Sequence, residues 1–196
     1  MDPLSGAIRE VTGALDRLGI RYAIGGSLAS SARGIWRATM DVDAVAAILP
    51  GHVEDFLLAL GRDWYADAET MREAVTAGRP FNIIHMRHVM KVDVFLAQES
   101  FHQSQLGRAT ILSIGDERIP CNVTTAEDIL LSKLRWYADG GQAPNSPWSD
   151  ITTLLAANPS IDNAYLNLWA ARLGATALLE RARLESAGAE EWARIH

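Results

Sequence analysis

Two aspartates, Asp41 and Asp43, are separated by a single residue in the segment 39–48, which begins with the alternation of a β-strand. Side chains alternate between the two faces of a strand, so residues two apart project the same way, with Cα atoms roughly 6.5 to 7 Å apart. Two carboxylates on one face offer hard oxygen ligands, which suit Mg²⁺ or Mn²⁺. The pair alone is weak evidence for a metal site, because solvated carboxylates are common at strand ends.

A third aspartate, Asp93, lies at the centre of the apolar run 91–96. Burying a lone carboxylate is costly unless it is paired, hydrogen-bonded or bound to a metal. If this strand lies beside that of Asp41 and Asp43, the three acids form a triad able to hold two cations about 3.5 to 4 Å apart. Asp93 is then the candidate that activates an attacking hydroxyl. The alternative is that Asp93 simply pairs with Lys91 or with an arginine.

The third feature is the turn Gly25-Gly26-Ser27, which ends 14 residues before Asp41 at an expected strand-to-helix junction. Glycines let backbone N–H groups approach a phosphate closely, and a helix N-terminus favours an anion. We expect Ser27 to cap the following helix and to bond a phosphate oxygen. The turn is not a Walker A loop, because no lysine follows it, and a lone Gly-Gly-Ser is more often merely a turn.

The elements expected around these residues divide the chain in two. Apolar periodicity and turn residues predict helices at 8–18, 28–33, 52–60 and 66–77, strands at 21–24 and at the start of 39–48, and hairpins pairing 81–86 with 91–96 and 109–113 with 118–123. Beyond a capping box at Thr124 and Glu127, the pattern predicts only helices, at 128–137, 148–157, 161–173 and 175–187. We therefore expect a mixed α/β core over residues 1–123 and a helical region over residues 124–196.

Several other kinds of site find little support in the sequence. Cys121 is the only cysteine, which excludes an internal disulfide and a thiolate metal cage. His85 and His88 straddle an expected hairpin turn, and a zinc site would need further ligands that their spacing does not supply. A serine hydrolase is unsupported, because nothing around Ser27 resembles a nucleophile elbow.

Charge and hydropathy restrict the location and the partners. The formal net charge of -6 argues against non-specific binding of nucleic acid, although Arg33, Arg37 and Lys91 lie close in sequence to the acids. The longest apolar stretch, 44–50, is far too short to span a bilayer. Residues 1–9 lack the pattern of a signal peptide. We expect a cytoplasmic protein without a membrane partner.

Taken together, the motifs resemble those of a known superfamily. Gly25-Gly26-Ser27, then Arg37-x-Thr39-x-Asp41-x-Asp43, then a single Asp93 in an apolar strand is similar to the nucleotidyltransferases related to DNA polymerase β. The nearest branch is the set of small uncharacterised bacterial nucleotidyltransferases near the AbiEii toxins and the minimal nucleotidyltransferases. The segment 125–137 resembles the helix of this family that carries a lysine, here Lys133. The chain departs from the family at Ser149, where a basic residue usually precedes the last acid, so we assign no role to Asp150.

The resemblance implies an α/β (α+β) nucleotidyltransferase fold, in which a mixed sheet with flanking helices is followed by a C-terminal helical bundle. It implies that Asp41, Asp43 and Asp93 hold Mg²⁺ or Mn²⁺ and that Asp93 assists the acceptor. It also implies that the nucleoside triphosphate is bound by the following residues: Gly25, Gly26, Ser27, Arg37 and Lys133. Lys133 has an equally weighted alternative as a solvated helix lysine.

The implied reaction transfers a nucleoside monophosphate (NMP) from a nucleoside triphosphate (NTP) to an acceptor hydroxyl, with release of pyrophosphate. RNA, protein and small molecules are all open as acceptors. The first rival interpretation is a non-catalytic antitoxin or partner-binding module of a toxin–antitoxin system, bound through its C-terminal helices. A second rival is a purely structural metal-binding domain. Neither the oligomeric state nor the base of the nucleotide can be read from the residues.

Overall fold

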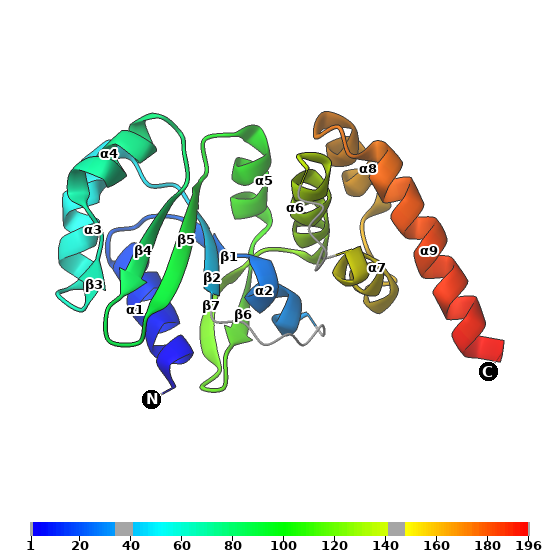
Figure 1. The fold of residues 1–196 in the computed structure, drawn as a ribbon, viewed down its shortest axis with the longest axis horizontal. Helices are drawn as coiled ribbons and strands as arrows, with labels where there is room; N and C mark the ends of the chain where they lie inside the picture. The colour runs from blue at the N-terminus through cyan, green and yellow to red at the C-terminus, as the bar shows by residue number, and fades with distance from the viewer. Residues whose placement is uncertain (1, 34–40, 141–147, 196) are drawn as a thin grey trace. The chain divides into compact units, whose positions relative to one another are not determined.

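The structure is a computed structural model that describes residues 2–33, 41–140 and 148–195 (Figure 1). These residues form two compact units. The first contains residues 2–32 and 41–125, and the second contains residue 33 together with residues 126–140 and 148–195.

The first unit is built on a sheet whose seven strands in the described residues are ordered β3-β4-β5-β2-β1-β7-β6. The strands are β1 (Tyr22–Ile24), β2 (Asp41–Ala46), β3 (Trp64–Tyr65), β4 (Phe81–His85), β5 (Met90–Leu96), β6 (Thr110–Ile114) and β7 (Ile119–Val123). Strands β2 and β5 pair in parallel, as do β1 and β7, whereas all other neighbours are antiparallel. The sheet is therefore mixed, and the two strands that carry the acids are direct neighbours.

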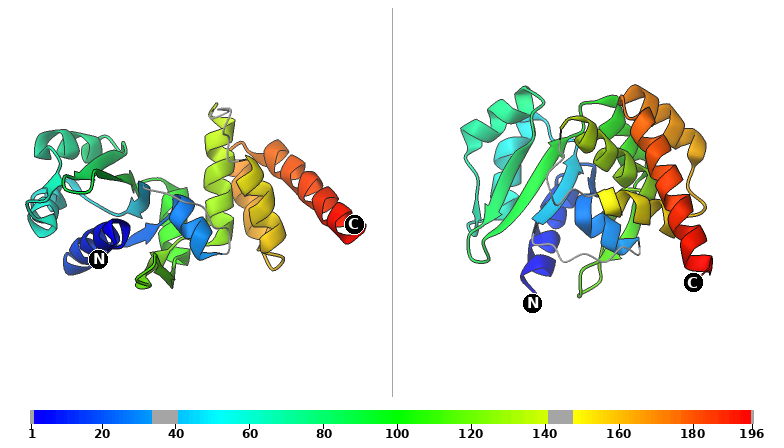
Figure 2. Two further views of the ribbon diagram at one scale, coloured as in Figure 1. Left: turned by 60° about the horizontal axis from the view of Figure 1, so that its bottom comes forward. Right: turned by 45° about the vertical axis from the view of Figure 1, so that its right-hand side comes forward.

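Helices flank this sheet. They are α1 (Pro3–Arg17), α2 (Gly26–Ala32), α3 (Val53–Leu60), α4 (Ala68–Thr76) and α5 (Ser100–Arg108), with a short 3₁₀ turn η1 (Pro50–His52) before α3. Helix α1 packs on β5, β7 and α3, while α4 packs on α3 and β4 (Figures 1 and 2). The core contains the fully buried Ile8 and Val11 of α1 and, on the strands, Val42 and Val92. The alternation of β2 and β5 turns these valines to the face opposite the acids.

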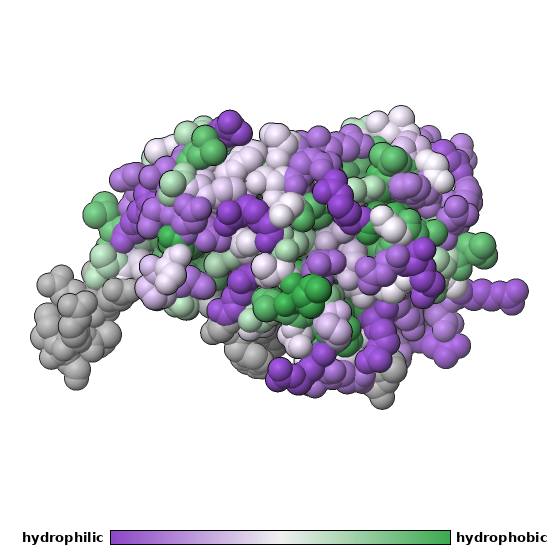
Figure 3. Space-filling view, turned by 180° about the vertical axis from the view of Figure 1, so that it is seen from behind, coloured by the Kyte–Doolittle hydropathy of each residue, from purple (hydrophilic) through white to green (hydrophobic). Residues whose placement is uncertain are grey.

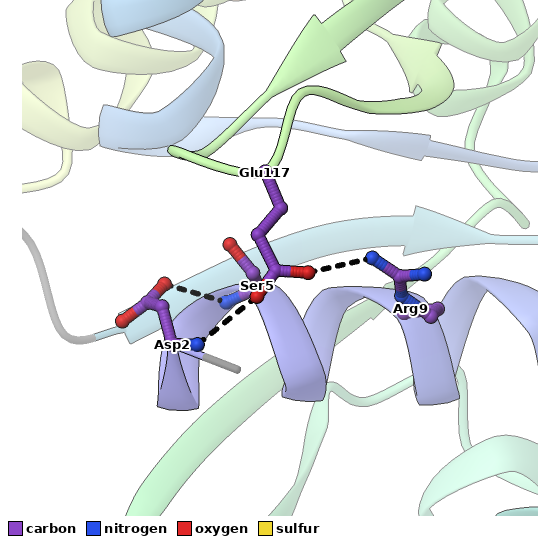
Figure 4. A network of polar contacts seen from close by, with 4 residues as sticks. All are labelled: Asp2, Ser5, Arg9 and Glu117. Carbon is purple, nitrogen blue, oxygen red and sulfur yellow. Dashed lines mark hydrogen bonds and ion pairs between the residues drawn. The ribbon is translucent and has the colours of Figure 1, made fainter.

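The beginning of α1 is tied to the turn between β6 and β7 by a small polar network (Figure 4). Asp2 caps the helix by accepting a hydrogen bond from the backbone N–H of Ser5 at 2.9 Å. Glu117 accepts from the Asp2 backbone N–H at 3.0 Å and from the Arg9 guanidinium at 2.8 Å. Arg9 and Glu117 are partly exposed, 52% and 30%, so their ion pair stabilises the fold by at most about 1 kcal/mol.

The second unit consists of four helices within the described residues, α6 (Ala126–Ala138), α7 (Trp148–Ala157), α8 (Asn163–Arg172) and α9 (Thr176–Ile195). Helix α6 packs on the other three, and α9 packs on α7 and α8. Their shared core is made by the following buried side chains: Leu130, Leu131, Leu134, Ile151, Leu154, Leu166 and Leu179. The fully buried carboxylate of Asp128 accepts a hydrogen bond of 2.7 Å from the hydroxyl of Tyr165, which offsets part of its desolvation.

The fold class expected from the sequence is confirmed, while some elements differ from the expectation. Strand β3 and helix α5 were not predicted: β3 is only two residues long, and α5 is largely polar and buries only Phe101 and Gln105. In the part of the chain that the structure describes, no helix combines the length and the hydropathy that a bilayer crossing requires. On the face shown in Figure 3, hydrophobic residues are dispersed in small areas among hydrophilic ones.

Candidate active site

The parallel register of β2 and β5 places the three predicted acids on one face of the sheet. Asp43 lies directly opposite Asp93, and Asp41 lies directly opposite Lys91. Paired strands are about 4.8 Å apart, and residues two apart on a strand share a face. Asp41, Asp43, Lys91 and Asp93 therefore form a square of four charged side chains, which we call the acid face.

The glycine turn lies against this acid face. The backbone N–H of Gly25 donates a hydrogen bond of 2.8 Å to the carbonyl oxygen of Asp43, which joins the end of β1 to β2. Gly26 has a φ of +57°, and a Cβ atom built on it would lie 1.8 Å from Oδ2 of Asp43. Only glycine fits such an approach of the main chain to a carboxylate.

Ser27 lies in the first turn of α2 rather than at its N-cap, so the prediction that it caps the helix is wrong. Helix α2 begins at Gly26, and the carbonyl of Gly25 accepts the hydrogen bond from the N–H of Ala29 at 3.1 Å. Gly25 thus takes the position that the sequence pattern had given to Ser27. Helix α2 therefore begins two residues earlier than predicted, and its first residue, Gly26, has a positive φ. Ser27 is half-buried and next to the glycine that contacts Asp43.

Asp93 is paired with a lysine, as the alternative drawn from the sequence had it. The ammonium Nζ of Lys91 lies 2.7 Å from Oδ2 of Asp93, and the two side chains are 44% and 26% exposed. The hydrogen bond to Asp93 raises the pKa of Lys91 above its usual value, and the charges of Asp41 and Asp43 add to this rise. The i,i+2 spacing of Lys91 and Asp93 is the sequence signal for this placement.

The three carboxylates of the acid face are chemically suited to a hard cation, but they are not arranged as a metal-binding group. Among the residues described, no group of three or more His, Cys, Asp or Glu side chains is arranged to hold a metal ion. In this arrangement, Oδ2 of Asp93 is bound by Lys91. Carboxylate oxygens on adjacent strands are nevertheless the ligands that Mg²⁺ and Mn²⁺ prefer. The acid face therefore offers oxygen ligands of the kind that suit a divalent cation, which would compete with Lys91 for Asp93.

Two further residues, Arg37 and Lys133, were expected to bind the nucleotide. Arg37 lies outside the described residues. Lys133 is on α6 in the second unit, where its ammonium pairs with Oδ2 of Asp150 on α7 at 2.9 Å. The two side chains are only 13% and 18% exposed. Lys133 is thus not a solvated helix lysine, and the geometry shows it joining two helices.

His85 and His88 form a packing cluster instead of a metal site. Their rings stack with centroids 4.8 Å apart, and the edge of His85 meets Trp64 at 5.0 Å. Nε2 of His85 lies 3.6 Å from a carboxylate oxygen of Glu10, which also accepts a hydrogen bond from the indole of Trp64 at 2.7 Å. Stacked rings direct their nitrogen lone pairs along parallel planes, so they do not converge on one ion.

Comparison with known proteins places the fold among nucleotidyltransferases. The sequence matches no family model and no curated protein. The structure is similar to the solution structure of the antibiotic-resistance factor ANT(2'')-Ia, with 16% identity, a TM-score of 0.51 and 100% of both chains covered. It is also similar to crystalline ANT(2'')-Ia in complex with adenylyl-2''-tobramycin, with 16% identity, a TM-score of 0.53 and coverage of 86% of this chain and 95% of that one.

A third similar structure is an antigenic nucleotidyltransferase-like protein from Paracoccidioides brasiliensis. It is 20% identical, with a TM-score of 0.53, and the match covers 95% of this chain and 92% of that one. At such identities the similarity establishes the fold. The chain therefore has the nucleotidyltransferase fold that its motifs had suggested.

Proposed function

We propose that this chain is a metal-dependent nucleotidyltransferase that moves an NMP from an NTP to an acceptor hydroxyl and releases pyrophosphate. The observation that carries the proposal is the contact between the Gly26 backbone and the Asp43 carboxylate, directly across from Asp93. A glycine turn and two opposed carboxylates are what phosphoryl transfer requires: a place for the triphosphate beside a place for its cation.

Each residue has a role that follows from its position. Asp41, Asp43 and Asp93 hold the divalent cation, which when bound neutralises charge on the phosphates and polarises them. The backbone of Gly25 and Gly26 and the hydroxyl of Ser27 orient the triphosphate. The acceptor oxygen attacks the α-phosphorus, the bond from that phosphorus to the pyrophosphate oxygen breaks, and the acceptor proton passes to the Asp93 carboxylate. Catalysis here consists mainly of positioning and charge compensation. The family resemblance, and not the geometry of the acid face, is the ground on which we also propose Arg37 and Lys133 as nucleotide-binding residues.

We place a small-molecule hydroxyl first among the acceptors. The net charge of -6 disfavours a long nucleic acid, and one structure of similar fold was solved in complex with adenylyl-2''-tobramycin. RNA and protein acceptors are the other outcomes of the assay. From its motifs we also propose that the chain is a bacterial cytoplasmic protein near the AbiEii and minimal nucleotidyltransferase branch.

The assay supplies each α-³²P-labelled NTP with Mg²⁺ or Mn²⁺ to three acceptor pools: small metabolites, RNA and protein. Native protein is compared with Asp43→Asn and with Asp139→Asn, which removes the same charge from an exposed residue that directly follows α6. We expect Asp43→Asn to lose label transfer by roughly 10²–10³-fold and Asp139→Asn to match the native protein. Failure of the native protein to bind any NTP in equilibrium dialysis would refute the proposal. Metal binding without nucleotide binding would indicate a structural metal domain.

A second candidate is a partner-binding module, such as the antitoxin or toxin half of a pair. The observation in its favour is that Trp136, Leu168 and Leu184 are large apolar residues exposed on α6, α8 and α9 of the helical unit. This function would survive Asp43→Asn and would be abolished by Leu184→Glu. Co-purification of the native chain and both variants with a co-expressed neighbouring gene product separates it from the enzyme.

A further inference from the structure

Lys91 is the single cation in the square of the acid face, and the charged residues among its strand neighbours lie on one side of it. On β2 it faces Asp41, and along β5 it shares a face with Asp93. On its other side, β4 places Ile84 opposite Lys91 and Asn82 opposite Asp93, both of them uncharged. The charges that attract the ammonium therefore lie among the three acids, and its nitrogen is found 2.7 Å from Oδ2 of Asp93.

The ion pair of Lys91 and Asp93 is more exposed to solvent than the other lysine–aspartate pair, so it separates at a lower cost. The sequence has only two lysines, and each is paired with an aspartate. The side chains of Lys133 and Asp150 are 13% and 18% exposed, so separating them would leave two unpaired charges largely buried. Lys91 is 44% exposed, and the apolar residues beside it on β5, Met90 and Val92, are buried on the opposite face. Its ammonium can swing into water on a flexible four-carbon arm without disturbing the core.

We propose that Lys91 is a built-in counter-ion of Asp93 that a divalent cation must displace, so that Lys91 sets the metal affinity of the acid face. The inference rests on the proposed function, since it takes these acids to be metal ligands. An ammonium on Oδ2 of Asp93 and a divalent cation on the same carboxylate repel each other, so binding of Mg²⁺ is opposed while Lys91 remains there. The same positive charge compensates the Asp93 carboxylate while no metal is bound.

Two consequences follow for the assembled site. Metal alone binds weakly, because it competes with Lys91 for the Asp93 carboxylate and is repelled by the ammonium. Metal that arrives with an NTP binds better, because the displaced ammonium gains the triphosphate as a partner. Lys91 thereby couples loading of the cation to loading of the nucleotide.

The test is a titration with Mn²⁺ in the absence of nucleotide, with free Mn²⁺ measured by electron paramagnetic resonance. Lys91→Gln is expected to bind Mn²⁺ about ten-fold more tightly than the native protein, which is about 1.4 kcal/mol. The size follows from removing one unit charge a few ångströms from a divalent ion in a water-like medium. Lys91→Arg keeps the charge and is expected to keep native affinity.

The matched control is Arg9→Gln, which removes a cation from an ion pair of 2.8 Å with similar exposure, 52% and 30%, in the same unit. It is expected to leave Mn²⁺ affinity unchanged. Lys91→Met retains most of the methylene arm and serves as a second variant for which folding is checked by circular dichroism. In EDTA, both neutral variants are expected to melt below the native protein, and Mn²⁺ is expected to raise their Tm by more than it raises that of the native protein.

The outcomes separate the inference from the function on which it rests. If Asp43→Asn loses Mn²⁺ binding while Lys91→Gln and Lys91→Met bind like the native protein or more weakly, the metal site stands and the role of Lys91 is overturned. If native protein and Asp43→Asn bind Mn²⁺ equally, or neither binds it, both ideas fall.

Discussion

Replacing Gly26 by alanine places a methyl group where the carboxylate of Asp43 lies. The added Cβ would be 1.8 Å from Oδ2 and 2.7 Å from Cγ of Asp43, both well inside van der Waals contact. The backbone at Gly26 also has a φ of +57°, which strains any residue that has a Cβ. The substitution therefore acts on the backbone and on the carboxylate at once.

The expected cost is the sum of these two effects. A left-handed backbone costs a non-glycine residue roughly 1–2 kcal/mol, and forcing a neighbouring group aside costs roughly 1–3 kcal/mol. We expect Gly26→Ala to lower the free energy of unfolding by about 2–5 kcal/mol. Gly25→Ala is the control, because its Cβ would meet only the Asp43 carbonyl oxygen at an ordinary 3.9 Å. Its effect should stay within about 0.5 kcal/mol.

The assay is urea unfolding followed by circular dichroism, together with a double-mutant cycle. In an Asp43→Ala background, Oδ2 and Cγ are absent and only the Cβ of residue 43, at 3.0 Å, remains close. Gly26→Ala should then cost little more than the backbone strain, about 1–2 kcal/mol. The reasoning is refuted if Gly26→Ala and Gly25→Ala have the same effect. It is also refuted if the cost of Gly26→Ala is unchanged without the Asp43 carboxylate, because the contact would then contribute nothing.

Two further predictions concern groups outside the acid face. Burial raises the pKa of the Cys121 thiol to about 11 and that of Tyr22 to about 12, so both favour the folded state below their unfolded pKa values and lose that contribution as the pH rises from about 9 to 12. Urea unfolding should show falling stability over this range, with a smaller fall for Cys121→Ala and Tyr22→Phe, and a flat profile would contradict the assignment. Asp150→Ala should destabilise the helical unit by about 2–4 kcal/mol, because it leaves the Lys133 ammonium largely buried and unpaired. The double variant Lys133→Met/Asp150→Leu should recover most of that loss in the same unfolding assay. If Lys133 instead serves only to bind the nucleotide, the double variant should have a lower NTP affinity, and both variants should unfold like the native protein.

Local patterns in the sequence were enough to assign the parts of the candidate site. The spacing of Asp41 and Asp43 places them on one face wherever that strand lies, because strand alternation depends only on the backbone. The glycine turn at positions 25 and 26 was visible between an expected strand and an expected helix, but the structure requires glycine only at position 26. The pattern did not predict the exact start of α2, which lies two residues before the expected one, at Gly26, whose φ is positive.

The contacts between these parts were decided by the tertiary structure. Asp43 and Asp93 are 50 residues apart in the chain, and only the parallel register of β2 with β5 sets them opposite each other. A shift of that register by one residue would have turned every side chain of β5 to the other face relative to its partners. The approach of Gly26 to the Asp43 side chain likewise depends on how β1 and β2 pair.

The two lysines show the same division between sequence and structure. Lys91 is two residues from Asp93, and the family resemblance covers the segments that contain Lys133 and Asp150. The residue type alone gives each lysine a positive charge. The sequence therefore determined which charges this chain has and which face of its own strand or helix each one takes. The tertiary structure decided that Lys91 stays half-exposed beside three acids while Lys133 is largely buried between α6 and α7. The physical reason is that local periodicity depends on the backbone alone, whereas burial and long-range pairing depend on which elements pack together.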